Sequence, residues 1–94
     1  MKIIYKQILP QRRQNEYGSL PILLPEDAIV LKVSERFGII FIWFLTDSSN
    51  KSEKKDRVFE IVPTGMAFND EFLKYIDTLF QEQFVWHLFE RIIP

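Results

Sequence analysis

His87, the only histidine of the chain, is the residue best suited to acid–base or metal chemistry, and it lies in the aromatic segment FVWHLFE (84–90). A hydrolase would need a nucleophile and an orienting acid beside this ring, and a zinc site would need further His, Cys or carboxylate ligands. The chain has no cysteine and no second histidine, so we expect no metal site and no disulfide. Two interpretations of His87 stay open: a partly buried ring with one satisfied hydrogen bond, or a contact for a binding partner.

A second set of polar groups brackets the stretch RVFEIVPTG (57–65), with Arg57 at its start and Thr64 and Gly65 at its end. A guanidinium can bind a phosphate or a carboxylate through two parallel N–H donors, and Thr64-Gly65 offers a hydroxyl beside an accessible backbone N–H. The same residues also suit structural roles, in which Arg57 closes a charged loop and the Pro-Thr-Gly forms a turn. Arg12 and Arg13 are further candidates for binding an anion.

The acidic residues of the last third do not form a recognisable catalytic pair. They are Asp70, Glu71, Asp77, Glu82 and Glu90. No periodicity forces any two of them together. The three glycines, Gly18, Gly38 and Gly65, form no phosphate-binding fingerprint, so we expect no nucleotide cofactor. The sequence therefore favours a protein without catalytic residues and without enzymatic activity.

Charge and composition limit the partners of the protein. The net charge is −1, so we do not expect direct binding of nucleic acid. Residues 1–15 contain lysine and arginine but no acid, whereas residues 69–90 contain five acids against a single lysine. These oppositely charged ends either meet across a subunit contact or form two solvated faces. The longest apolar run, GIIFIWFL, is too short to span a membrane, and the basic start lacks the apolar core of a signal peptide.

Aromatic residues are unusually frequent, with nine Phe, two Trp and three Tyr in 94 residues. Each buried aromatic removes about 150–250 Å² from water. One small core cannot easily enclose all of them together with the many aliphatic residues, and surplus apolar surface on a small domain usually marks an interface. We therefore expect a homo-oligomer, a dimer or higher.

The elements that must position these groups follow from hydrophobic alternation. Strands are predicted over 3–9 as an edge, over 20–25 between two prolines, and over 57–64. The segment 27–47 reads as a hairpin that turns at SERFG, and its second strand, IIFIWFLT, is expected to be central and covered on both faces. Segments 10–19 and 47–56 are predicted loops.

Residues 67–92 allow two interpretations. One is a short turn or helical piece at 67–73 followed by strands at 74–81 and 84–92, and the other is a single helix from 70 to 90. We favour the first. The predicted fold is a single domain, 1–94, that is mainly β, with α+β as the alternative. It consists of a small antiparallel sheet of five or six strands, barrel-like or sandwich, and one short helix.

Three segments, R-x-F-x-I-x-x-T-G (57–65), L-x-Y-I-x-T (73–78) and V-x-H-x-F-E (85–90), together resemble a small phage-encoded family of unknown function. The earlier segments LPEDAIVLKV and IIFIWFLTD also match it, so the likeness covers about residues 20–90. The turn before VWHLFE departs from the family, because it contains Gln81-Glu82-Gln83 in place of glycines. The resemblance implies a viral origin and a compact, mainly β domain, and it supplies no catalytic residues.

The resulting expectation is a non-enzymatic phage accessory protein that acts in the host cytoplasm by inhibiting or sequestering a host defence protein. That form predicts an exposed apolar or acidic patch within residues 69–90 or 48–56. An alternative is an oligomeric sponge for a signalling nucleotide, in which Arg57, Thr64, His87, Arg12 and Arg13 converge on phosphate at a subunit interface. A virion component is a third possibility.

Overall fold

The computed structural model describes residues 1–9, 18–49 and 53–92, and within these ranges it contains seven β-strands and no helix. The strands are β1 (Lys2–Ile8), β2 (Gly18–Pro25), β3 (Ile29–Arg36), β4 (Ile39–Asp47), β5 (Lys54–Pro63), β6 (Leu73–Gln81) and β7 (Phe84–Arg91). No helix of the described ranges is long and apolar enough to cross a membrane. Arg12 and Arg13 lie outside the described residues.

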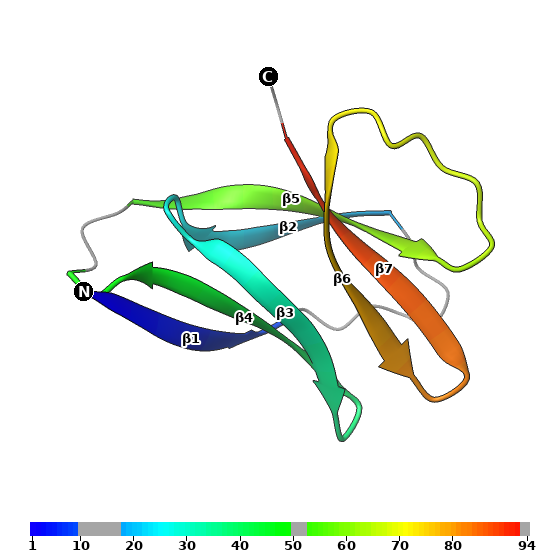
Figure 1. Ribbon diagram of the computed structural model, residues 1–94, viewed down its shortest axis with the longest axis horizontal. Helices are drawn as coiled ribbons and strands as arrows, with labels where there is room; N and C mark the ends of the chain where they lie inside the picture. Colours follow the sequence, from blue (N-terminus) through cyan, green and yellow to red (C-terminus); the bar gives the residue numbers. More distant parts are fainter. Residues whose placement is uncertain (10–17, 50–52, 93–94) are drawn as a thin grey trace.

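The strands form two open antiparallel sheets (Figure 1). The first sheet has the order β1-β4-β3 and the second the order β2-β5-β7-β6. The predicted edge position of β1 and the central position of β4 are both confirmed. The mainly β prediction is also confirmed, but the number of strands is seven and not five or six.

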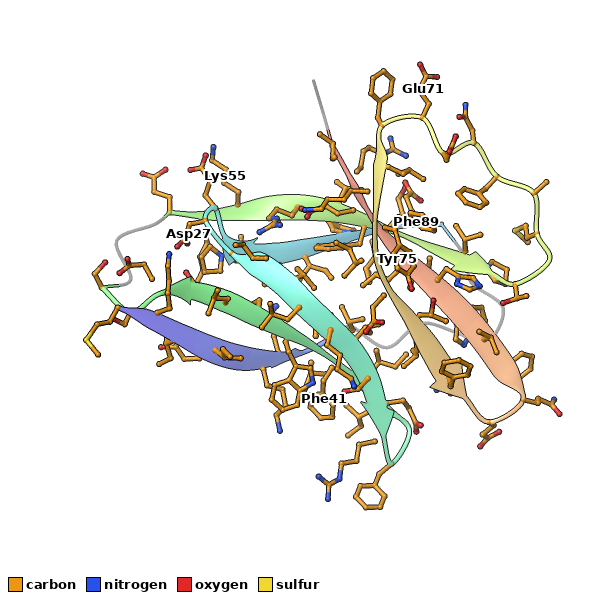
Figure 2. All side chains as sticks on the ribbon, viewed as in Figure 1. Asp27, Phe41, Lys55, Glu71, Tyr75 and Phe89 are labelled. Carbon is orange, nitrogen blue, oxygen red and sulfur yellow. The ribbon has the colours of Figure 1, made fainter. Side chains whose placement is uncertain are left out.

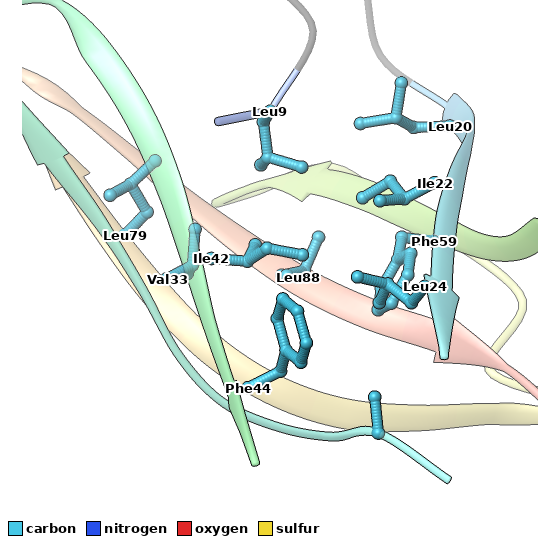
Figure 3. Packing of buried hydrophobic residues seen from close by; sticks show 11 residues of the cluster. Leu9, Leu20, Ile22, Leu24, Val33, Ile42, Phe44, Phe59, Leu79 and Leu88 are labelled. Carbon is cyan, nitrogen blue, oxygen red and sulfur yellow. The ribbon is translucent and has the colours of Figure 1, made fainter. Parts of the chain in front are cut away.

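Alternating apolar residues of both sheets meet in one core (Figure 3). Leu24 of β2, Ile42 of β4 and Phe59 of β5 are fully buried in it. Each such side chain stabilises the fold by about 1.5–3 kcal/mol relative to an exposed position. The other side of β4 is different, because Phe41, Trp43 and Leu45 face outward and stay half-buried. The prediction that β4 is covered on both faces is therefore wrong.

The two sheets meet along a seam between β3 and β6, and Asp77 connects the strands there. Each strand carries a β-bulge, at Val30/Lys32 in β3 and at Tyr75/Asp77 in β6. Asp77 accepts the N–H of Val33 through Oδ2 at 3.0 Å and the N–H of Thr78 through Oδ1 at 2.8 Å. One carboxylate therefore satisfies two backbone donors at the seam, where regular strand pairing stops.

Residues 66–72 form an irregular loop, and the predicted short helix at 67–73 is wrong. The Oδ1 of Asn69 accepts the N–H of Glu71 at 2.9 Å in a local turn. Phe72 has a φ of 62°, a left-handed conformation that ends any right-handed helical path. The alternative of a helix from 70 to 90 is also wrong, because the chain forms β6 and β7 joined by the turn Glu82-Gln83.

Candidate functional site

Thr64 and His87 lie together on the outer face of the second sheet, although 23 positions separate them in the sequence. β5 runs antiparallel to β7, with Val62 opposite His87, so Thr64 follows directly at the end of the pair. The hydroxyl of Thr64 lies 2.7 Å from Nε2 of His87. Both the N–H and the hydroxyl of Thr64 donate to the carbonyl of Val85, at 3.1 and 3.2 Å. Two of the residues nominated from the sequence are thus brought into contact.

The other ring nitrogen of His87 continues this polar chain. Nδ1 lies 3.1 Å from the hydroxyl of Thr78, which in turn lies 2.5 Å from the phenol oxygen of Tyr75. The hydroxyl of Thr64 donates its proton to the carbonyl of Val85, so its oxygen accepts from Nε2–H of His87. Nδ1 of His87 then accepts from the hydroxyl of Thr78. Each group in this series thus donates to the next, from the hydroxyl of Tyr75 through Thr78, His87 and Thr64 to the carbonyl of Val85.

The surroundings of the His87 ring differ from those of the histidine in a catalytic triad. Within the ranges that the structure describes, no carboxylate hydrogen-bonds to either ring nitrogen of His87, so the ring has no orienting acid of the kind that a triad has. Both ring nitrogens contact threonine hydroxyls, and one of these hydroxyls is held by a backbone carbonyl. The arrangement fixes the orientation of the ring at the surface, which suits recognition better than proton transfer.

Gly65 begins the loop that leaves the sheet beside this chain. Its φ of 90° is one that residues with a side chain rarely adopt. The N–H of Met66 donates to the carbonyl of Pro63 at 3.3 Å and closes the turn. The structure thus gives Gly65 a role in directing residues 66–72 away from β5.

Arg57 does not join Thr64 and His87, because its side chain points to the inner face of the second sheet. It forms two hydrogen bonds with Glu90, from Nε to Oε2 and from Nη2 to Oε1, at 2.5 and 2.7 Å. Its Nη1 donates to the carbonyl oxygens of Ala28 and Pro25. The guanidinium is thus occupied by the fold and is not directed toward a ligand.

An open hollow of about 380 Å³ lies where the 66–72 loop passes over β5 and β7. It is lined by Glu60, Val62, Phe68, Asn69, Glu71, Phe72, Leu73 and Arg91. Its one arginine, Arg91, pairs with Glu60, which also accepts the hydroxyl of Ser19 at 2.7 Å. Glu71 projects from the top of the loop (Figure 2) and has no ion-pair partner among the described residues. The surroundings of the hollow are therefore aromatic and mildly acidic.

Aromatic rings extend from this hollow toward His87. The ring of Phe89 lies between Phe68 and Tyr75, with centroid distances of 5.1 and 5.7 Å, and Figure 2 shows Phe89 and Tyr75 next to each other. Phe68, Phe72, Tyr75 and Phe80 are all exposed. We call this surface the aromatic face and define it by Phe68, Phe72, Tyr75, Phe80, His87 and Phe89, with Glu71 at its margin.

Several residues of the aromatic face were missed by sequence reasoning. Phe68 and Phe72 belong to the segment that was predicted to be partly helical, and Phe80 was not nominated as a site residue. The sequence carried one usable signal: Tyr75, Thr78 and Phe80 align opposite Phe89, His87 and Val85 once the hairpin register is known. The acidic residues also separate in space, since Asp77 caps the seam and Glu90 pairs with Arg57. Among the described residues, no group of three His, Cys, Asp or Glu side chains could hold a metal ion.

The family model for a domain of unknown function, DUF7352, matches residues 1–94. The chain belongs to this family. No curated protein and no solved structure matches the chain. DUF7352 membership agrees with the expectation of an uncharacterised family, and the site must be interpreted from its own geometry.

Proposed function

We propose that this protein is a non-enzymatic binding protein that docks another protein on the aromatic face. The observation that supports this most strongly is the outward position of Phe68, Phe72, Tyr75 and Phe80 beside a hollow with an acidic margin. Exposed aromatic rings are costly in water and are enriched at the centres of protein interfaces. Apart from Phe68, this surface falls within residues 69–90, where the sequence led us to expect an exposed apolar or acidic patch.

The charges around the hollow favour a partner with a basic side chain at the centre of its contact. Arg91 is already neutralised by Glu60, whereas Glu71 has no ion-pair partner among the described residues and can attract a cation. A lysine or arginine of a partner can enter between aromatic rings and gain about 0.5–2 kcal/mol from cation–π contact. Neighbouring apolar residues of the partner would cover the remaining rings.

A nucleotide sponge is less well supported by the same geometry. A phosphate needs converging cations, but Arg57 lies on the opposite face of the sheet and is held by Glu90. Among the described residues, Thr64 and His87 hydrogen-bond to a hydroxyl and a backbone carbonyl and not to a lysine or arginine. Arg12 and Arg13 lie outside the described residues, so a contribution from them stays a prediction.

The biological setting of the proposal comes from the resemblance to short phage-encoded chains. That resemblance supports a viral accessory protein that acts in the cytoplasm of the host, and a host defence protein is the partner that we propose. A role in the virion is the alternative, and mass spectrometry of purified particles distinguishes the two. Finding the chain at stoichiometric levels in particles would favour the virion role.

The test compares partner capture by the wild type and three variants of the protein in infected host cells. Phe72→Ala and Glu71→Lys alter the aromatic face, and Ile29→Ala is the matched control because Ile29 is 55% exposed on the first sheet and Phe72 is 54% exposed. We expect one host protein to copurify with the wild type and the control and to be lost from the other two variants. Calorimetry with cyclic nucleotides and ADP-ribose derivatives completes the test. Heat from any of these that disappears in His87→Ala would overturn the protein-partner form.

A further inference from the structure

The outer side of the first sheet carries an excess of positive charge. Strand pairing places alternate residues of β1 and β3 on this side, beside the outward-facing Phe41, Trp43 and Leu45 of β4. The charged strand residues of this side are Lys2, Lys6, Lys32, Arg36 and Asp47, and all four cations are exposed. Four positive charges against one negative charge leave an excess of three. The net charge of −1 for the whole chain conceals this separation.

Two lysines flank the indole ring of Trp43 at the centre of this side. Lys6 of β1 and Lys32 of β3 are its partners in the neighbouring strands, so the three side chains form one row across the sheet. Nζ of Lys6 lies 5.5 Å from the ring centroid of Trp43 and 4.8 Å from that of Phe41. The indole N–H donates to the hydroxyl of Ser34 at 3.0 Å. An amphipathic ring between long cationic side chains is typical of the boundary between lipid and water.

Apolar rows lie on both sides of this charged row. Ile4 is paired with Leu45 on one side of it. Ile8 is paired with Phe41 on the other side. Ile4 and Ile8 are 57% and 56% exposed, and among the strands that the structure describes none packs over this outer side. Cationic and apolar side chains thus alternate in rows across an open surface.

Phe37 adds an exposed ring at one end of this side. It lies in the turn between β3 and β4, and its side chain is 89% exposed. The guanidinium of Arg36 lies 5.4 Å from its ring centroid. The backbone of Phe37 is left-handed, with a φ of 53°, which is unfavourable for a bulky residue. The ring therefore extends the cationic and apolar surface beyond the strands.

We propose that the outer side of the first sheet binds the surface of an anionic phospholipid membrane. The negatively charged headgroups attract the four cations, and Ile4, Ile8 and Phe37 enter the boundary between the headgroups and the acyl chains. This is peripheral binding, which needs no membrane-spanning segment. The proposal does not depend on the aromatic face, which lies on the second sheet and stays accessible to a protein partner.

The composition of this side favours a membrane over a nucleic acid or a protein. A single-stranded nucleic acid stacks its bases on accessible rings, but Phe41 and Trp43 are half-buried and Lys6 lies over both. A protein interface concentrates its binding energy in a central apolar cluster, whereas a row of cations separates the exposed apolar residues here. An anionic membrane presents continuous negative charge above a continuous apolar layer, and both layers match the alternating rows.

Sedimentation with vesicles tests the proposal on the whole chain. We expect the wild type to sediment with vesicles of phosphatidylglycerol and phosphatidylcholine in equal parts, and not with vesicles of phosphatidylcholine alone. Lys32→Glu should weaken this binding by roughly tenfold or more, because it reverses a charge and each cation near an anionic surface contributes about fivefold. Lys54→Glu is the matched control, since Lys54 is an exposed lysine of the second sheet. It should weaken binding by less than about threefold in physiological salt, which screens distant charges.

Two further measurements test the apolar contribution and the face that contacts lipid. Phe37→Asn should weaken vesicle binding by about fivefold or more, and unfolding cannot cause this loss because asparagine suits the turn better than phenylalanine. The chain has no natural cysteine, so Ile4→Cys can carry a fluorophore that reports on its surroundings. Its emission should rise on vesicle binding. The same label at Phe80→Cys, 71% exposed on the second sheet in the wild type, should not respond.

Other outcomes overturn the proposal. Absence of binding to anionic vesicles excludes it, and so does binding that Lys32→Glu and Lys54→Glu weaken equally or that changes only the label on the second sheet. Binding of polyglutamate at least as tight as that of vesicles would replace the membrane by an acidic protein. The same result with single-stranded oligothymidylate would replace it by a nucleic acid. Circular dichroism of each variant checks that it is folded before binding is measured.

Discussion

Arg57 and Glu90 pair through two parallel hydrogen bonds on the inner face of the second sheet, where both side chains are mostly shielded, at 18% and 15% exposure. Arg57 also reaches the carbonyl of Ala28 just before β3. It therefore ties β5 to β7 and to the start of the first sheet. Arg57, which the sequence suggested as an anion-binding residue, therefore binds the carboxylate of Glu90 within the fold.

Arg57→Ala should lower the free energy of unfolding by about 3 kcal/mol, because it leaves the Glu90 carboxylate shielded and unpaired. Arg57→Lys should recover only part of this loss, since an ammonium cannot form the parallel pair of bonds. Chemical denaturation measures both. Arg91→Ala is the control, because the Arg91–Glu60 pair is half exposed on its arginine side and should contribute less than about 1 kcal/mol. Equal losses in the two alanine variants would contradict this assignment.

Asp77 should be the most sensitive position of the seam between β3 and β6. Asp77→Ala leaves the N–H groups of Val33 and Thr78 without their acceptors, and we expect a loss of about 1–3 kcal/mol. Asp77→Asn should be milder, because its one carbonyl oxygen can still accept one of the two. Hydrogen exchange should show faster exchange at Val33 in the alanine variant. Unchanged exchange there would mean that another group satisfies this donor.

His87→Ala should weaken partner binding without unfolding the protein. The ring contacts the hydroxyls of Thr64 and Thr78 at the surface, and both hydroxyls can bind water when it is removed. We expect a stability loss of no more than about 1 kcal/mol, typical of one neutral hydrogen-bonded group that is only partly buried. His87→Gln, which can keep one of the two contacts, should bind better than the alanine variant. Partner binding that is unaltered in both would exclude His87 from the interface.

Asp47 gives a pH-dependent effect among the residues that the structure describes. Its pKa is lowered from the ordinary 3.8, first by the hydrogen bond from the backbone N–H of Ser49, with smaller contributions from the amino terminus and Lys2. Because the folded-state pKa lies below the unfolded one, the ionised form stabilises the fold above the unfolded pKa, and this contribution is lost as the pH falls through the lowered folded value. An NMR titration of the Asp47 carboxyl carbon should give a midpoint below 3.8. Ser49→Pro, which removes the donor, should raise it.

The strands could be predicted from the sequence because the alternation of apolar and polar residues is a local property of each segment. β6 and β7 were expected at 74–81 and 84–92 and are found at Leu73–Gln81 and Phe84–Arg91, in spite of the unusual Gln81-Glu82-Gln83 turn. The loop before β6 was misread because Asn69-Asp70-Glu71 also suits a helix start. The left-handed backbone of Phe72 is imposed by the return of the chain to the sheet, which no local pattern reveals.

The site was only partly predictable for a similar reason. Thr64 and His87 were nominated as residue types, but their contact depends on the pairing of β5 with β7. Arg57 was nominated on the same grounds, yet alternation along β5 places it on the opposite face from Val62 and beside Glu90. Composition correctly indicated more aromatic surface than one core encloses, but not which rings stay outside.

Phe37 offers a last test of function, because phenylalanine is an unfavourable residue for the stability of the turn in which it lies. It occupies the first position of the β3–β4 turn with a φ of 53°, and its ring is 89% exposed. Asparagine tolerates this left-handed conformation better than phenylalanine, and Asn-Gly is the preferred pair for such a two-residue turn. Phe37→Asn should therefore raise the free energy of unfolding by about 0.5–1 kcal/mol, even after loss of the contact with the Arg36 guanidinium at 5.4 Å. Gly38→Ala is the opposing control and should destabilise, because Gly38 has a φ of 80°. If Phe37→Asn is more stable and loses a partner, the ring is an interface residue retained at the expense of the turn; if it is less stable than the wild type, Phe37 belongs to the packing of the hairpin.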